Sequence, residues 1–207
     1  MSILVFGKTG QVACELQRLH PEFTYLSREE ADLSNPDACG ETILAAKPSA
    51  VINAAAYTAV DHAEDEESLA YTINAEAPAA MANACATLGI PFVHISTDYV
   101  FDGSGEMSRA PDAPTAPINA YGRTKLAGEE AIHSSGAPSV GWAEFAREIF
   151  AQANRSVTVT DIPTKDYPTP AARPLNSRLD CASLLSDFGV KQPQWKDELT
   201  KVISELT

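Results

Sequence analysis

The chain has 207 residues, of which 28 are acidic and 15 are basic, so its formal net charge is −13 with the histidines neutral. Proteins that bind the phosphate backbone of nucleic acids need clustered Lys and Arg, so this charge argues against a nucleic-acid partner. No stretch approaches the roughly 18 apolar residues that span a bilayer, and no signal-peptide pattern precedes the first apolar run. We therefore expect neither membrane insertion nor a targeting segment.

The cysteines favour a reducing compartment. Cys14, Cys39, Cys85 and Cys181 are widely spaced and form neither a C-x-x-C pair nor a metal pattern with histidine. Free thiols of this kind are typical of cytoplasmic proteins. We expect a cytoplasmic protein without a structural metal site.

Short apolar runs alternate with helical patterns in the first half of the chain. The apolar runs predict four strands, at residues 3–6, 23–26, 50–53 and 92–95. The helical patterns predict helices between them, at residues 11–19, 36–46 and 71–88. Strands separated by helices imply parallel crossover units, so the fold class is a doubly wound, Rossmann-like α/β sheet. Ligands of such sheets bind beyond the carboxyl ends of the strands.

A glycine-rich turn follows the first strand. Gly7, Gly10 and Ala13 have the spacing G-x-x-G-x-x-A. In a dinucleotide site the first glycine permits the tight turn, the second lets the backbone approach a pyrophosphate, and the third small residue permits close helix packing. Glycine also serves plain strand-to-helix turns, but the position between a strand and a helix favours dinucleotide binding.

A charged stretch follows the second strand. Asp32 lies 22 residues beyond Gly10, near the distance at which a carboxylate meets the adenosine end of a dinucleotide. Arg28 could bind a 2′-phosphate, which slightly favours NADP(H) over NAD(H). The alternative is a solvated loop in which Arg28 pairs with neighbouring acids.

The ends of the third and fourth strands carry the remaining candidates. Small residues at 54–56 would let a ligand pass close to the backbone, although an Ala-rich helix start explains them equally well. Thr97 follows the fourth strand, and Tyr121 and Lys125 lie four residues apart on one face of a predicted helix. A nearby ammonium would lower the pKa of the Tyr121 phenol from about 10, which favours acid–base chemistry.

These segments together resemble the dTDP-4-dehydrorhamnose reductases, a family of extended short-chain dehydrogenases/reductases. The resemblance covers residues 1 to about 136 and about 141 to 207. It rests on five segments, namely Gly7–Val12, Asn53–Asp61, Ser96–Phe101, Tyr121–Glu129 and Arg173–Asp180.

The resemblance implies reduction of the C4 keto group of dTDP-4-dehydro-L-rhamnose by NADPH or NADH. It implies that Tyr121 donates the proton, Lys125 binds the nicotinamide ribose and Thr97 polarises the carbonyl. Asp98 matches a substrate contact, and Arg173 is a candidate for the substrate diphosphate. Cofactor contacts are expected at Gly7, Thr9, Gly10, Gln11, Val12, Arg28, Asp32, Leu33, Ala55, Ala56, Tyr57, Thr58, Tyr121 and Lys125.

Two other functions stay open at this point. A nucleotide-binding regulatory subunit without catalysis could use the same fold. An epimerase or dehydratase of another sugar nucleotide is weaker, because Tyr99 stands where dehydratases tend to carry an acid. The family also implies a possible homodimer, sometimes with Mg²⁺, for which Glu15 and Glu205 are conceivable ligands, although solvated side chains are the simpler reading.

The sequence departs from the family after the Tyr-Lys helix. Residues 131–141 lead directly into the Trp142 segment, without the apolar strand and the roughly 75 residues that the resemblance implies there. We expect residues 1–137 to form the dinucleotide-binding domain and residues 138–207 to be a helical remnant of the substrate domain with a Pro-rich loop. A segment missing from the printed sequence, an internal deletion or a rewired chain could explain the difference. The first is favoured, because loss of later strands would expose an apolar sheet edge.

Overall fold

The computed structural model describes residues 2–110, 112–130, 132 and 169–180. These residues fall into two compact units. The first contains the described residues of 2–102, 114–132 and 170–174, and the second contains 103–110, 112–113, 169 and 175–180. Most of the predicted C-terminal remnant therefore lies outside the described residues.

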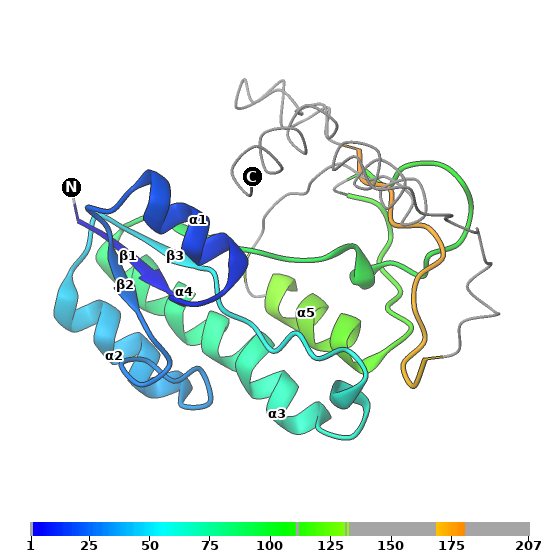
Figure 1. The fold of residues 1–207 in the computed structure, drawn as a ribbon, viewed down its shortest axis with the longest axis horizontal. Helices are drawn as coiled ribbons and strands as arrows, with labels where there is room; N and C mark the ends of the chain where they lie inside the picture. The colour runs from blue at the N-terminus through cyan, green and yellow to red at the C-terminus, as the bar shows by residue number, and fades with distance from the viewer. Residues whose placement is uncertain (1, 111, 131, 133–168, 181–207) are drawn as a thin grey trace, which may run out of the picture. The chain divides into compact units, whose positions relative to one another are not determined.

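Four parallel strands form the sheet of the first unit, in the order β2-β1-β3-β4 (Figure 1). The strands are β1 (Ile3–Phe6), β2 (Thr24–Leu26), β3 (Ala50–Asn53) and β4 (Phe92–His94). Phe6 is in register with Asn53, and Asn53 with His94, so three strands end at one edge of the sheet. The order reverses at β1, which lies between β2 and β3, and this is where doubly wound sheets bind ligands.

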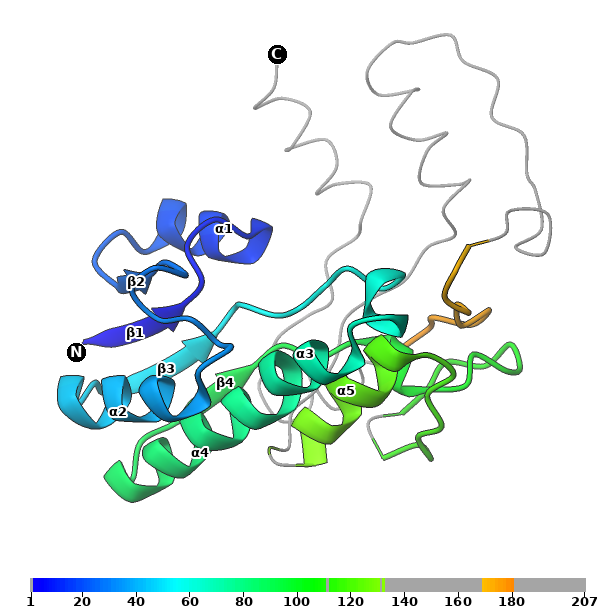
Figure 2. The same cartoon turned by 90° about the horizontal axis from the view of Figure 1, so that it is seen from below.

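Helices cover both faces of the sheet. Helix α1 (Gln11–Leu19) lies on one face, and α2 (Pro36–Ala46) and α4 (Ala77–Leu88) lie on the other (Figure 2). Asn35 caps α2 by accepting a hydrogen bond from the Ala38 N–H, which satisfies one of the free donors of the first turn. The predicted doubly wound α/β fold is confirmed.

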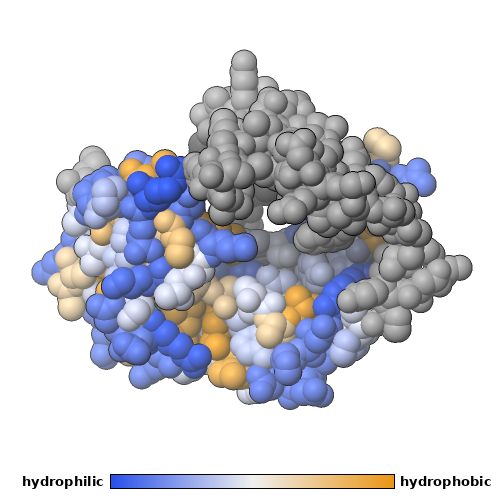
Figure 3. All heavy atoms as spheres, viewed as in Figure 1, coloured by the Kyte–Doolittle hydropathy of each residue, from blue (hydrophilic) through white to orange (hydrophobic). Residues whose placement is uncertain are grey.

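The core lies between the sheet and the helices α2 and α4. Phe6, Ile43 and Met81 are fully buried there, and burial of each such side chain contributes about 1.5–3 kcal/mol. Figure 3 shows mainly hydrophilic residues on one face of the described part, as the acidic composition predicts. Among the described residues, no helix is long and apolar enough to cross a membrane.

The predicted helix at residues 71–88 is longer and less regular than expected. It begins with α3 (Glu67–Tyr71), widens into a π-helical segment at Thr72–Glu76 and continues as α4. Pro78 lacks the N–H that would bond to the Asn74 carbonyl in a regular α-helix. The Asn74 carbonyl therefore has no such intrahelical donor, and π segments of this kind are frequent at functional sites.

Helix α5 (Ala120–Glu130) packs against two backbone carbonyls through glycines. A Cβ atom on Gly122 would lie 2.2 Å from the Tyr99 carbonyl oxygen, and one on Gly128 would lie 2.2 Å from the Asn74 carbonyl oxygen. No real Cβ approaches an oxygen so closely, so α5 reaches its position only because both residues lack a side chain. The helix that carries Tyr121 and Lys125 is thus fixed at both ends.

We predict that Gly122→Ala and Gly128→Ala each destabilise the protein. The added Cβ must push α5 away from a backbone carbonyl, and overpacking of this kind costs about 1–3 kcal/mol. Gly40→Ala in helix α2 is the matched control, because its Cβ would meet its nearest neighbour, the Ala80 carbonyl oxygen of α4, only at 3.4 Å. Thermal unfolding measures all three variants, and an unchanged melting temperature for both α5 variants would contradict the packing described here.

Candidate active site

A cleft of about 680 Å³ opens at the carboxyl ends of β1 and β3. Its walls come from the loops after β1, β2, β3 and β4 and from α5. It is lined by Gly7, Lys8, Thr9, Gly10, Gln11, Val12, Arg28, Ala31, Asp32, Leu33, Ala54, Ala55, Ala56, Thr58, Ile73, Ile95, Ser96, Tyr121 and Lys125. Except for Tyr57, every residue predicted to contact the cofactor lines this cleft.

The two glycines of the first loop have different surroundings. Gly7 has φ +101°, and a Cβ there would lie 3.2–3.3 Å from the backbone of Ala54 and Ala55. Gly10 has φ −73° and ψ 157°, and a Cβ there would meet no protein atom closer than 3.9 Å. Gly7 is therefore required by the turn itself, whereas Gly10 leaves open space on the cleft side of the loop.

Helix α1 begins directly after this loop. Gly10 is its N-cap and provides no side-chain cap for the first N–H groups. Uncapped N–H groups and the positive end of the helix dipole attract anions. The cleft therefore places an anion-binding helix end beside the open space at Gly10, which fits the pyrophosphate of a dinucleotide.

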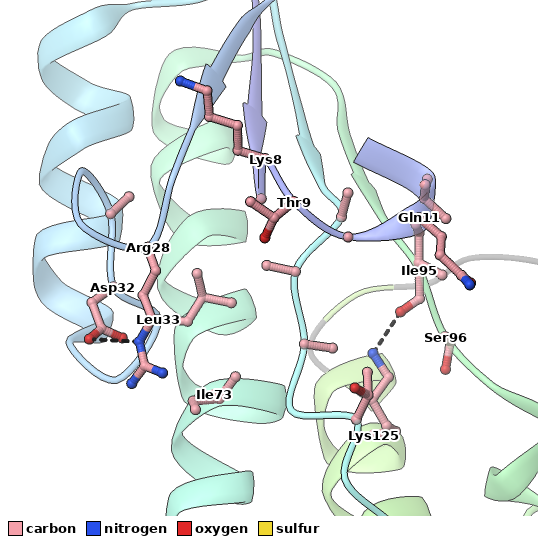
Figure 4. A pocket seen from close by; sticks show the side chains of 18 of the residues that line it. Lys8, Thr9, Gln11, Arg28, Asp32, Leu33, Ile73, Ile95, Ser96 and Lys125 are labelled. Atoms are coloured by element: carbon pink, nitrogen blue, oxygen red, sulfur yellow. Dashed lines mark hydrogen bonds and ion pairs between the residues drawn. The ribbon is translucent and has the colours of Figure 1, made fainter. Parts of the chain in front are cut away.

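Arg28 and Asp32 lie at one end of the cleft (Figure 4). Arg28 Nε is 3.4 Å from Asp32 Oδ2, and the Arg28 side chain is 77% exposed. The pKa of Asp32 is lowered, chiefly by the hydrogen bond from the Ser34 backbone N–H and less by Arg28. This weak, exposed pair leaves the guanidinium able to turn toward a ligand at the predicted adenosine end.

Lys125 lies at the other end of the cleft (Figure 4). Its side chain is 1% exposed, and its Nζ donates a hydrogen bond to the Ile95 carbonyl at 2.6 Å. Nζ is also 3.1 Å from His94 Nε2, and the Asn53 amide nitrogen is 3.0 Å from Nδ1 of the same ring. Burial lowers the pKa of Lys125 to about 8 and that of His94 to about 3, so His94 is neutral.

The prediction that Lys125 lowers the pKa of the Tyr121 phenol is wrong. The pKa of this phenol is raised, not lowered, mainly because the ring is buried. A hydrogen bond with Thr97 lowers it in part, while Asp98 and Tyr99 raise it. The Lys125 Nζ donates to the Ile95 carbonyl. Because its pKa is raised, Tyr121 is protonated at neutral pH and suited to donate a proton.

Thr97 and Asp98 lie beside Tyr121. The Thr97 hydroxyl accepts a hydrogen bond from the Tyr99 N–H at 3.3 Å, and the Tyr99 ring packs edge-on against Tyr121 at 5.5 Å. Asp98 Oδ2 is buried and has no hydrogen-bond partner among the described residues. Such an atom is costly unless a ligand or water satisfies it, so it fits the predicted substrate contact.

Four predicted site residues are not among those that line the cleft, namely Tyr57, Thr97, Asp98 and Arg173. The Tyr57 hydroxyl donates to Glu66 Oε2 at 2.6 Å, and its backbone N–H donates to Asn74 Oδ1. Arg173 forms a two-pronged ion pair with Asp61 at 2.7 and 2.9 Å. The cofactor role of Tyr57 and the diphosphate role of Arg173 stay predictions.

Several residues of the cleft had no role predicted from the sequence. Ile73 belongs to the π-helical segment, whose position depends on the shape of the helix rather than on a motif. Lys8 and Ser96 stand inside recognised motifs but carried no assigned role. His94 could have been noticed, because a histidine within an apolar strand must bury its polar ring atoms.

The comparisons with known proteins agree with this geometry. The family model described as the RmlD substrate binding domain matches residues 1–138 and 132–207. The dTDP-4-dehydrorhamnose reductase of Salmonella typhimurium is 31% identical over 293 positions, which cover 100% of this chain and 98% of that protein.

Two solved structures of proteins with the same name are also similar. The protein from Clostridium acetobutylicum has a TM-score of 0.90 and 28% identity, covering 100% of this chain and 99% of its own. The protein from Bacillus anthracis, solved in complex with NADP, has a TM-score of 0.89 and 26% identity, covering 99% of each chain.

The same comparisons show that this chain is shorter than its relatives. The Salmonella alignment has 293 positions and this chain has 207 residues, so at least 86 positions have no counterpart here. The two matched ranges of the family model meet at residues 132–138, beside the predicted junction. The backbone at 136–141, which would test the favoured explanation of a missing segment, lies outside the described residues. The full-length matches nevertheless show that the chain belongs to the dTDP-4-dehydrorhamnose reductase family.

Proposed function

We propose that this protein reduces the C4 keto group of dTDP-4-dehydro-L-rhamnose with NADPH. The observation that carries the proposal is that Tyr121, whose phenol is protonated, and the buried Lys125 line the same cleft as the Gly7–Gly10 loop. The relatives are named dTDP-4-dehydrorhamnose reductases, which supports dTDP-4-dehydro-L-rhamnose as the substrate. The NADP complex of the Bacillus anthracis protein and the exposed Arg28 support the choice of NADPH.

The residues of the cleft fit a nicotinamide dinucleotide. The open space at Gly10 and the free N–H groups of α1 suit a pyrophosphate, and the guanidinium of Arg28 suits a 2′-phosphate. At the other end, the Lys125 ammonium has three donors and can offer one to a ribose hydroxyl. When bound, the reduced nicotinamide supplies the hydride.

The side chains around Tyr121 then complete the reduction. The Thr97 hydroxyl can donate to the substrate carbonyl oxygen and so stabilise the negative charge that develops there. The Tyr121 phenol gives its proton to this oxygen, so that the ketone becomes an alcohol. The buried Asp98 oxygen can accept a hydrogen bond from a sugar hydroxyl. The phenolate that remains on Tyr121 must regain a proton before the next turnover.

The missing positions favour one alternative, a subunit that binds NADP(H) without catalysis. At least 86 positions of the Salmonella relative have no counterpart in this chain, and the two matched ranges of the family model meet just after the Tyr-Lys helix. Absorbance of the reduced nicotinamide during incubation with the keto sugar nucleotide separates the two functions. Loss of absorbance supports the reductase, whereas NADPH binding without oxidation supports the alternative.

The other expectations from the family stay proposals. The described cysteines Cys14, Cys39 and Cys85 are free thiols, which fits a cytoplasmic location. Glu15, considered for Mg²⁺, pairs with Arg18, and no cluster of metal-ligating side chains occurs within the described ranges. Glu205 lies outside those ranges. A homodimer is proposed on the family resemblance alone.

We predict that Tyr121→Phe lowers kcat by about 100-fold or more, because the variant lacks the proton donor. Affinity for NADPH, measured by fluorescence titration, should stay near that of the wild type, because the ring and its packing are kept. Tyr71→Phe is the matched control, since Tyr71 is 45% exposed on α3. Equal turnover of the Tyr121 variant and the wild type would remove Tyr121 from the mechanism.

We predict that Gly10→Ala weakens NADPH binding by about tenfold or more, equivalent to about 1.4 kcal/mol, without lowering the melting temperature. The new Cβ meets no protein atom closer than 3.9 Å but occupies the space assigned to the pyrophosphate. Gly7→Ala should instead lower the melting temperature, because it adds strain at φ +101° and a contact with Ala54. Unchanged affinity of the Gly10 variant would place the cofactor elsewhere.

We predict that kcat falls as the pH rises through about 8. Burial lowers the pKa of Lys125 to about 8, so its ammonium is present below this pH and is lost above it. The pKa of Tyr121 is raised above its ordinary value of 10, so the phenol stays protonated over this range. A pH profile measured at saturating NADPH tests this, and a flat profile up to pH 9.5 would show that the ammonium is not required.

A further inference from the structure

Glu129 lies on α5, the helix that carries Tyr121 and Lys125, and contacts the segment that follows β4, but it takes no part in the mechanism proposed for the reduction. It lies four residues after Lys125 on α5, so the two side chains share one helix face. Its Oε1 accepts a hydrogen bond from the hydroxyl of Ser96, which lines the cleft. Burial raises the pKa of Glu129, while Ser96 and the charge of Lys125 lower it.

Lys125 needs an anionic neighbour because its other contacts carry no charge. The Ile95 carbonyl is neutral, and so is the His94 ring, whose pKa of about 3 keeps it unprotonated. An ammonium in such a site loses its hydration and becomes easier to deprotonate. The Glu129 carboxylate raises the pKa of Lys125 and thus opposes this effect of burial.

The other charged groups around α5 act elsewhere. Asp98 and Tyr99, in the short 3-10 helix Asp98–Val100, affect the pKa of Tyr121. Glu67 on α3 pairs with Arg123 at 2.8 Å. Glu64 accepts a hydrogen bond from the Ala120 N–H at the start of α5. Glu129 is therefore the carboxylate, among the described residues, whose charge acts on Lys125.

We propose that Glu129 is a positioning residue for the reduction, which keeps Lys125 in its ammonium form and ties the Ile95–Ser96 segment to α5. Ile95 and Ser96 are consecutive, and they bond to Lys125 and Glu129 respectively. Loss of the carboxylate would therefore make the Lys125 ammonium easier to deprotonate. It would also remove the hydrogen bond that holds Ser96 to α5. The proposal rests on the proposed function, since it assigns Glu129 a role in that same site.

The direct test is lysine NMR on the full chain. In protein labelled with ¹⁵N-lysine, the Lys125 Nζ signal is identified by its absence in Lys125→Met, and its titration gives the pH at which the ammonium is lost. In Glu129→Gln this midpoint should fall by about 1 pH unit, because an opposite charge at short range shifts a pKa by about 1–3 units. Glu129→Asp, which keeps the charge, should restore most of the shift.

Glu130→Gln is the matched control, because it removes the same charge from the neighbouring, exposed position of α5. It should leave the Lys125 midpoint unchanged. The wild type provides a second readout if Glu129→Gln fails to fold. Its Lys125 Nζ signal should move when Glu129 titrates above pH 4.5, because the pKa of Glu129 is raised from that value.

Kinetics connects the titration to the reaction. The pH at which kcat falls should move downward in Glu129→Gln by the same amount as the NMR midpoint, whereas a purely structural loss would lower kcat without moving the profile. An unchanged NMR midpoint in Glu129→Gln, or a wild-type signal that does not respond to acid titration, would overturn the proposal. Absence of turnover in the wild type with an intact NMR shift would instead overturn the proposed function alone.

Discussion

The site depends on how one face of α5 binds the segment that follows β4. Three successive residues of that segment each interact with a different side chain of this face: Ile95 with Lys125, Ser96 with Glu129 and Thr97 with Tyr121. Tyr121, Lys125 and Glu129 are spaced four residues apart, so a single helix can present all three. The strand end therefore fixes the amine, the carboxylate and the phenol relative to one another.

This docking is possible because the backbones come unusually close. Gly122 lies against the Tyr99 carbonyl, and Gly128 lies against the Asn74 carbonyl, which Pro78 leaves without its usual intrahelical donor. Asn74 is fully buried, and its side chain bonds to Tyr57 and Thr124, which connects the loop after β3 to α5. The π-helical segment thus links two walls of the cleft, and its irregular shape serves this contact.

The sequence predicted the fold correctly, and most of the predicted cofactor residues line a single cleft, because both follow from local patterns. Apolar runs set the strands, and the spacing of Gly7 and Gly10 placed the loop at the point where the strand order reverses. The π-helical segment was missed, since it depends on a proline within an otherwise ordinary helical pattern. The pKa of Tyr121 was predicted in the wrong direction, because the four-residue spacing to Lys125 does not show that the Tyr121 ring is buried, and burial is the main cause of the raised pKa. Glu129 was recognised in a motif but had no role, since its bond to Ser96 is a long-range contact.

The central claim is that Tyr121 and Lys125 lie beside the nicotinamide of a dinucleotide bound in this cleft. A crystal structure of the protein with NADP⁺ tests it most directly. The account predicts the pyrophosphate at the start of α1, a nicotinamide-ribose hydroxyl within hydrogen-bond distance of Lys125 Nζ, and the Tyr121 hydroxyl facing the nicotinamide ring. A cofactor bound with its nicotinamide away from Tyr121, or outside the cleft, would contradict the account.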